Sequence, residues 1–246
     1  NSYMNKKRLC TILGFIAALN INTTNCVNVD KEASVENKTI IELVKNVKNM
    51  VNEYLEENSN KEIYSFGYLK ADSNIYDYTD SCTKVNTTSK YQKVVVLSET
   101  KEYYYVETEE NILGYISKNN IGLIPDTFVE VDISDQTVNF YMNNELVLTT
   151  PCVTGNKGLH TRTGYFSISY KKYNTYLKGP GYKSHVYYWM PFDQAIGLHD
   201  ADGWRSKYGG DIYLTNGSHG CINLPHTAAE TIYNNVSAGT KVLVHK

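Results

Sequence analysis

A short run near the C-terminus, residues 217–223 with the sequence GSHGCIN, combines the residue types of a nucleophilic site. Cys221 supplies a thiol, and His219 lies two positions before it. An unperturbed thiol is only a few per cent thiolate at neutral pH, and we expect a nearby imidazole to lower its pKa by about 2 units. Gly220 lets the backbone approach a substrate carbonyl, and we expect the N–H groups of Gly220 and Cys221 to stabilise an oxyanion. The run therefore predicts a cysteine nucleophile for acyl transfer.

A second histidine, His199, lies upstream in the sequence IGLHD. The segment between the two sites, residues 201–217, is rich in glycine and polar residues and predicts a loop. A loop of this size can bring His199 back over Cys221, which gives a Cys–His pair from residues distant in sequence. His199 is therefore the candidate general base.

The sequence around both residues resembles the catalytic signature of the L,D-transpeptidases, a family of enzymes that cross-link peptidoglycan. The resemblance covers residues 126–246. Four further runs resemble the Gram-positive branch of this family: YWMPF, GLHD, GGD and GTKV, which begin at positions 188, 197, 209 and 239. The 22 positions from His199 to Cys221 slightly exceed the usual family spacing, and we expect the extra residue at a loop tip within residues 202–204.

This resemblance implies a cysteine-dependent acyltransferase of peptidoglycan synthesis, cell-wall biogenesis and cell shape. The donor is a tetrapeptide stem, and Cys221 attacks the carbonyl between its third residue and the terminal D-alanine. D-Alanine leaves, a thioester forms, and an acceptor amine from a second stem resolves it into a 3→3 cross-link. His199, oriented by the main-chain carbonyl of Asp200, takes the thiol proton. No cofactor is implied.

Further residues near the signature are candidates for orienting or contacting the substrate. Ser218 and Asn223 are expected to hold the cysteine loop through side-chain hydrogen bonds. His219 is expected to shape the oxyanion hole or the substrate pocket. Trp189 and Tyr182 are candidates for the aromatic wall of a peptide cleft, although Trp189 and Trp204 could instead be packing residues. Residues 171–183 are expected to form a mobile flap over the cleft.

Three other interpretations remain open at this point. His199, His219 and Cys221 could be zinc ligands, although no second metal motif supports this and a tightly bound metal would quench the nucleophile. Water instead of an amine could resolve the thioester, which would make the protein an L,D-carboxypeptidase. The protein could also be a cell-wall-binding module with an inactive catalytic half.

The composition excludes some partners and suggests a compartment. A net charge of −2 and a pI near 6.3 give no reason to expect nucleic acid. Residues 1–25 place a basic KKR segment before an apolar run over residues 9–19, which predicts an export signal or signal-anchor. We therefore expect an exported protein at the cell wall or the outer face of the membrane, with membrane anchorage through this segment as an alternative to cleavage. The five cysteines show no disulfide framework, and Cys152 is expected to fill the core.

Periodicity divides the rest of the chain. Residues 26–61 form a helix and linker, because apolar residues recur at helical spacing: Ile40, Val44, Val47, Val51 and Tyr54. This helix is expected to be a stalk or to dock on the next domain, with a coiled coil left open. Residues 62–124 contain short strand-like runs at 63–69, 94–98, 103–106 and 113–117. They resemble bacterial Src-homology-3-like domains, which often bind cell-wall peptides, and a spacer without a ligand is the open alternative.

Residues 126–246 alternate apolar and polar residues in hairpins, with turns at residues 135–136 and 143–144. The run TAAE from Thr227 predicts a capping box, followed by a helix that Gly239 ends. The predicted fold class is mainly β: a small N-terminal barrel-like domain, then a β-rich L,D-transpeptidase domain with one helix near the nucleophile.

Overall fold

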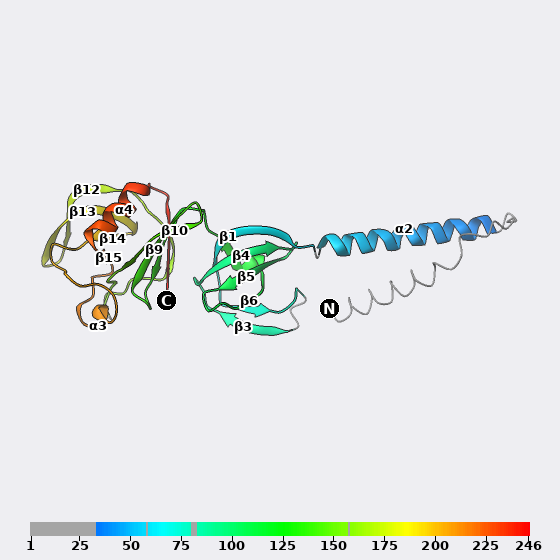
Figure 1. The fold of residues 1–246 in the computed structure, drawn as a ribbon, viewed down its shortest axis with the longest axis horizontal. Coiled ribbons are helices and arrows are strands. Elements are labelled where there is room, and N and C mark those ends of the chain that lie inside the picture. Colours follow the sequence, from blue (N-terminus) through cyan, green and yellow to red (C-terminus); the bar gives the residue numbers. More distant parts are fainter. Residues whose placement is uncertain (1–32, 58, 80–82, 157) are drawn as a thin grey trace.

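The computed structural model describes residues 33–57, 59–79, 83–156 and 158–246, with the backbone alone for residues 33–39 and 54–57. The predicted export signal over residues 1–25, and with it Cys10, Cys26 and Cys82, lies outside the described residues. A long helix, an N-terminal sheet and a C-terminal pair of sheets follow one another along the long axis of the molecule (Figure 1). The prediction of a mainly β fold is confirmed.

The helix α2 (Ala33–Glu57) occupies the segment in which the sequence predicts one. Its apolar side chains are not covered by the sheets: Ile40 is 47% exposed and Met50 54%. The helix therefore extends away from the sheets (Figure 1), as expected of a stalk, and does not dock on the following domain. None of the helices within the described ranges is both long and apolar enough to cross a membrane.

The N-terminal unit is a seven-stranded sheet. Its strands are β1 (Lys61–Leu69), β2 (Ser73–Tyr76), β3 (Lys84–Thr88), β4 (Lys93–Glu99), β5 (Tyr103–Thr108), β6 (Leu113–Ser117) and β7 (Ile121–Leu123), with a 3₁₀ turn η1 (Lys118–Asn120) before the last. The four predicted strands are β1, β4, β5 and β6. The other three are short, and β3 is largely exposed, so they lack the apolar alternation that sequence reading requires.

The strand order of this sheet is β3-β2-β6-β5-β4-β1-β7. Since β3 and β7 are its edges, the described strands do not close into a barrel, and that part of the prediction is corrected. Its core is formed by Leu69, Ile75, Val94, Val96, Val106, Ile116 and Ile121. The resemblance to Src-homology-3-like domains stays a prediction.

The C-terminal unit contains two sheets. The five-stranded sheet has the order β10-β9-β8-β16-β11, and the four-stranded sheet has the order β12-β13-β14-β15. Their strands are β8 (Phe128–Asp132), β9 (Thr137–Met142), β10 (Glu145–Pro151), β11 (Gly164–Ser167), β12 (Lys172–Gly179), β13 (Tyr182–Asp193), β14 (Ile196–Asp200), β15 (Ile222–Leu224) and β16 (Lys241–His245). The predicted turn at Asn143 and Asn144 is confirmed, and both residues have positive φ, as a tight hairpin turn requires.

One hydrophobic core joins side chains of both sheets and of a helix. It includes Val129, Phe140, Met190, Leu198 and Ile232, and the predicted core position of Cys152 is confirmed because its side chain is fully buried. This core fixes β14 and β15, which carry the candidate catalytic residues, against the rest of the domain.

Two helices lie within the described residues of this unit, where the sequence predicts one. The short helix α3 (Ile212–Asn216) lies within the segment predicted as a loop. The helix α4 (His226–Asn235) begins after Pro225 without a side-chain cap, so the capping box at Thr227 is wrong. Its C-cap is Val236, and Gly239, with φ of +92°, lies in the next turn instead of ending the helix.

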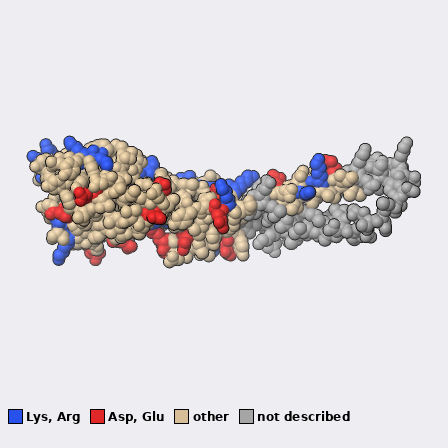
Figure 2. Space-filling view, turned by 45° about the horizontal axis from the view of Figure 1, so that its top comes forward, with Lys and Arg blue, Asp and Glu red and all other residues tan. Residues whose placement is uncertain are grey.

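The expected flap over residues 171–183 is a regular hairpin of β12 and β13, paired from Lys172↔Trp189 to Gly179↔Tyr182. Lys and Arg side chains gather at this end of the molecule (Figure 2). Lys172, Lys178 and Lys183 of the hairpin are exposed there. The hairpin therefore presents positive charge and tyrosine rings beside the site described below.

Aromatic rings join the N-terminal sheet to the catalytic unit. Phe66 of β1 packs against Phe128 and Tyr141, with ring centroids 5.4 and 4.7 Å away, in a buried cluster. Tyr68 stacks on Tyr165 at 4.1 Å. These contacts make a continuous apolar interface between the two units.

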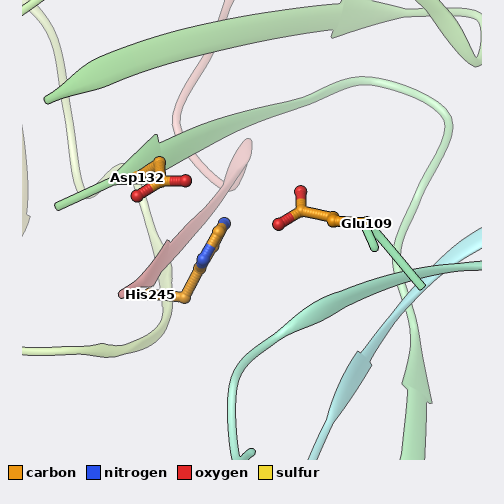
Figure 3. Close-up of side chains that lie close together, drawn as sticks. All are labelled: Glu109, Asp132 and His245. Atoms are coloured by element: carbon orange, nitrogen blue, oxygen red, sulfur yellow. The ribbon is translucent and has the colours of Figure 1, made fainter. Parts of the chain in front are cut away.

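A buried polar cluster lies beside these rings. Lys93 Nζ of β4 donates to Glu130 Oε2 of β8 at 2.6 Å and to the Tyr141 hydroxyl at 3.0 Å. Glu130 Oε1 accepts from His245 Nε2 at 2.8 Å. Around them the side chains of Glu109, Asp132 and His245 converge from different elements (Figure 3). The acidic groups thus surround an ammonium and an imidazole that come from both units.

Charge pairing outweighs burial in this cluster. Burial alone would lower the Lys93 pKa, but the charge and hydrogen bond of Glu130 raise it. Burial also opposes the Glu130 carboxylate, yet hydrogen bonds from His245 and Lys93 hold its pKa at about 2. The pair is therefore ionised at neutral pH.

We expect Lys93→Met to lower the free energy of unfolding by about 3–5 kcal/mol, because it leaves Glu130 buried without its ammonium partner. Denaturant unfolding at pH 7 measures this change. Lys118→Met is the matched control, since the Lys118–Glu99 pair is also 2.6 Å long but partly exposed, and about 1 kcal/mol or less is expected there. Equal losses in the two variants would contradict a buried, energetically coupled cluster.

Candidate active site

His199 and Cys221 meet because β14 and β15 pair in parallel. The register places His199 opposite Asn223 and Leu198 opposite Ile222. Cys221 immediately precedes β15, so it lies at the entrance of that strand beside the histidine. Parallel neighbours need a crossover connection, which residues 201–221 supply with α3 in it. Gly203 lies at the exposed tip of this connection, where a Cβ would meet open space.

The imidazole of His199 is held in one tautomer. Its Nδ1 lies 2.9 Å from the carbonyl oxygen of Asp200, which can only accept, so Nδ1 carries the proton and Nε2 carries the lone pair. The side chain is 3% exposed, and its ring lies 5.8 Å from the rings of both Trp189 and Trp204. Burial lowers the His199 pKa despite the opposing effect of Asp200. His199 is therefore neutral at pH 7 and able to accept a proton.

The carboxylate of Asp200 serves the scaffold. Its Oδ1 accepts from the backbone N–H groups of Tyr187 and Tyr188 at 2.9 and 2.8 Å. These bonds tie β13 to the end of β14, so the carboxylate fixes the strand while the carbonyl orients the imidazole.

The side chain of Asn223 connects His199 to a residue that the sequence analysis does not single out. In the amide orientation that satisfies both neighbours, its nitrogen donates to His199 Nε2 at 3.2 Å and its oxygen accepts from Arg205 Nε and Nη2 at 3.2 and 3.3 Å. The expected role of this side chain within the cysteine loop is corrected. Asn223 instead occupies the lone pair of the candidate base.

The cysteine loop is closed by Ser218. Its hydroxyl donates to the Cys221 carbonyl at 2.5 Å and accepts from the Gly220 N–H at 3.0 Å. Gly220 has a φ of +117°, and a Cβ there would lie 2.9 Å from Ile196, so only glycine fits. Since the Gly220 N–H is used by Ser218, it is not the oxyanion donor we expected. The Cys221 N–H, for which no described residue is an acceptor, remains.

The thiol of Cys221 is protonated in this arrangement. Burial raises its pKa to about 11, although an N–H bond from Gly197 partly offsets this. Its Sγ lies 3.7 Å from the Ala195 carbonyl oxygen, to which it donates. The expected lowering of the thiol pKa is wrong, because burial disfavours the thiolate and the neighbouring His199 imidazole carries no charge that would stabilise it.

A pocket of about 330 Å³ opens onto Cys221 and His199. His219 is exposed at its edge and stacks on Tyr182 of β13, with ring centroids 4.8 Å apart. Trp189 is not part of the lining: it is buried behind His199 and its Nε1 donates to the Tyr170 hydroxyl at 3.3 Å. The aromatic wall therefore comes from Tyr182 and Trp204, and Trp189 is a packing residue instead of a substrate contact.

Comparison with known proteins identifies this domain. The sequence model of the YkuD family, the L,D-transpeptidase catalytic domain, matches residues 126–244. The catalytic domain of an Enterococcus faecium L,D-transpeptidase, solved by NMR, is 39% identical over 50% of this chain and 100% of that chain, with a TM-score of 0.46. This chain belongs to the L,D-transpeptidase family.

Two further solved structures are similar. A crystal structure of a mutant of the Enterococcus faecium L,D-transpeptidase is 28% identical over 72% of this chain and 75% of that chain, with a TM-score of 0.49. The Enterococcus faecium catalytic domain acylated by ertapenem is 39% identical over 50% of this chain and 100% of that chain, with a TM-score of 0.47. No curated protein sequence matches the chain. Shared sequence, and not superposition, therefore decides the family.

The zinc alternative does not fit the L,D-transpeptidase site. Among the described residues, the group of potential ligands close enough to share an ion is Glu109, Asp132 and His245, at the interface between the units. His199, His219 and Cys221 do not form such a group, because His219 turns outward onto Tyr182.

Two residues of the L,D-transpeptidase site escape sequence reading. Thr161 Oγ1 donates to the Gly220 carbonyl at 2.8 Å and accepts from the Gly155 N–H at 2.9 Å, which fixes the back of the cysteine loop. Arg205 lines the pocket and binds Asn223. Thr161 begins the run TRTGYF, which resembles a run of the family but assigns the threonine no role. Arg205 is a single polar residue in an irregular segment, and no spacing pattern distinguishes it from ordinary surface residues.

We expect the rate of Cys221 alkylation by iodoacetamide to rise continuously from pH 7 to above pH 10, because thiolate forms only as pH approaches the raised pKa of about 11. Mass spectrometry of the alkylated peptide measures the rate at each pH. A plateau already reached below pH 8 would show instead a thiolate stabilised in the resting enzyme.

Proposed function

We propose that this protein forms 3→3 peptidoglycan cross-links through a thioester on Cys221, with release of D-alanine from a donor tetrapeptide stem. The observation that carries the proposal is the placement of the Cys221 thiol and a neutral His199 in one pocket of the L,D-transpeptidase domain. The pocket opens beside a hairpin with tyrosine and lysine side chains, which suits a peptide that bears carboxylates.

The first half-reaction begins with two neutral groups. Substrate entry displaces the Asn223 amide from His199 Nε2, and this nitrogen then takes the Cys221 proton as the sulfur attacks the scissile carbonyl. The Cys221 N–H donates to the developing oxyanion. Collapse of the tetrahedral intermediate breaks the peptide bond, and the imidazolium returns its proton to the amine of the departing D-alanine.

The second half-reaction uses the same groups in reverse roles. His199 accepts a proton from the acceptor amine as that amine attacks the thioester carbonyl. The new amide bond forms and the thiol leaves with the proton, so the enzyme is regenerated. Water in place of the amine would give hydrolysis, and thus an L,D-carboxypeptidase.

The proposal includes export to the cell wall, where polymeric peptidoglycan lies. It is supported by the basic and apolar segments within residues 1–25. The N-terminal sheet would then act as a spacer or as a wall-peptide binder, with α2 as its stalk.

We expect incubation with a purified disaccharide-tetrapeptide to give a Cys221 adduct that lacks D-alanine, or a dimeric product, detected by intact mass. Cys221→Ala removes the nucleophile and abolishes both. Cys152→Ala is the matched control, since Cys152 is buried in the core and should leave the adduct unchanged.

Each other outcome has a definite meaning. Release of D-alanine with tripeptide product but no dimer, even with an added acceptor amine, would favour the carboxypeptidase. Cross-linking retained in Cys221→Ala would overturn the mechanism. Wall binding without any thiol adduct would favour an inactive catalytic half.

A further inference from the structure

Arg205 brings a positive charge into the pocket that contains Cys221. It is partly buried, in the connection between β14 and β15. Its Nη1 donates to the Asn216 carbonyl oxygen at 2.9 Å at the end of α3, and its Nε and Nη2 donate to the Asn223 side chain. The guanidinium is therefore fixed in direction by two neutral acceptors.

No carboxylate neutralises this group within the described part of the chain. By contrast, Arg162 pairs with Asp193. A guanidinium has five N–H donors. The contacts with Asn216 and Asn223 use three of the five donors of Arg205, so two donors have no described partner. Burial lowers the Arg205 pKa, as expected for a cation without a counter-charge. A partly buried cation with unused donors in a substrate pocket is suited to bind an anion.

The pocket indicates which anion fits. Cys221 and Arg205 both line it. A single peptide residue spans about 3.5 Å, so a donor whose carbonyl contacts the sulfur, and which ends one residue later, brings its terminal carboxylate into the same pocket as Arg205.

We propose that Arg205 binds the C-terminal carboxylate of the donor peptide, one residue beyond the scissile bond. This inference rests on the proposed function and assigns Arg205 as a specificity-determining residue for a donor that ends one residue after the attacked carbonyl. The carboxylate takes the two N–H donors that the Asn216 and Asn223 contacts leave open.

The test compares two donors and three proteins. The donors are the disaccharide-tetrapeptide and the same compound with a C-terminal carboxamide, and the proteins are wild type, Arg205→Gln and Lys207→Gln. Lys207 is the matched control, because it is an exposed cation in the same connection and does not line the pocket. The rate of Cys221 acylation is measured by intact mass.

We expect wild type and Lys207→Gln to acylate the free acid about 10- to 100-fold faster than the amide, the range of charge-assisted hydrogen bonds. Arg205→Gln should acylate the acid slower than wild type by a similar factor and the amide at nearly the wild-type rate. The ratio of its acylation rates on acid and amide should therefore fall to near one. If Arg205→Gln slowed both donors equally, Arg205 would act only by positioning Asn223, and the proposal would be overturned. Equal wild-type rates on acid and amide would overturn it too.

A second measurement separates this inference from the proposed function. Iodoacetamide alkylation of Cys221 is followed with N-acetyl-D-alanine or N-acetyl-D-alaninamide present. We expect the acid, and not the amide, to slow alkylation of wild type, and neither to slow alkylation of Arg205→Gln. If no stem forms a thioester but this protection persists, the cross-linking function fails and the carboxylate site stands. If the acid and the amide protected Cys221 equally, the proposed carboxylate site would be overturned, and the proposed cross-linking function would be unaffected.

Discussion

The parallel pairing of β14 with β15 is the constraint on which the site depends. It sets His199 opposite Asn223 and places Cys221 at the start of the adjacent strand. The crossover that such pairing requires also carries Arg205 into the pocket. The packed core behind both strands, from Leu198 to Ile232, keeps this register in place.

Burial, more than charge, determines the resting chemistry of the site. It raises the Cys221 pKa to about 11 and lowers that of His199, so both groups are neutral before substrate binds. Asn223 stabilises this state by donating to the His199 lone pair. The proposed thioester chemistry therefore requires the substrate to change the hydrogen bonding of the pocket. A neutral thiol also reacts slowly with stray electrophiles and oxidants.

The interface between the N-terminal sheet and the catalytic domain follows the opposite rule, because charges there are buried in pairs. Lys93 and His245 come from different units and share the Glu130 carboxylate. The neighbouring rings of Phe66, Phe128 and Tyr141 exclude water from this pair. Removing one partner of such a buried pair is therefore expected to cost more stability than replacing both partners by apolar residues.

The sequence by itself indicated the candidate nucleophile Cys221, the candidate base His199 and most long strands, because these depend on local residue types and on alternation within one segment. The orienting role of the Asp200 carbonyl was implied by the family resemblance, and the structure places that carbonyl 2.9 Å from His199 Nδ1. The tertiary structure alone decided the hydrogen bonds that set the reactivity of Cys221 and His199. The Gly220 N–H is taken by Ser218, the His199 lone pair by Asn223, and Trp189 is buried. The tertiary structure was also required to find helix α3, the open edges of the N-terminal sheet and the position of Arg205 in the pocket. Burial and pairing across segments have no signature in a single sequence, so neither the direction of the Cys221 pKa shift nor the partner of Arg205 could be read from it.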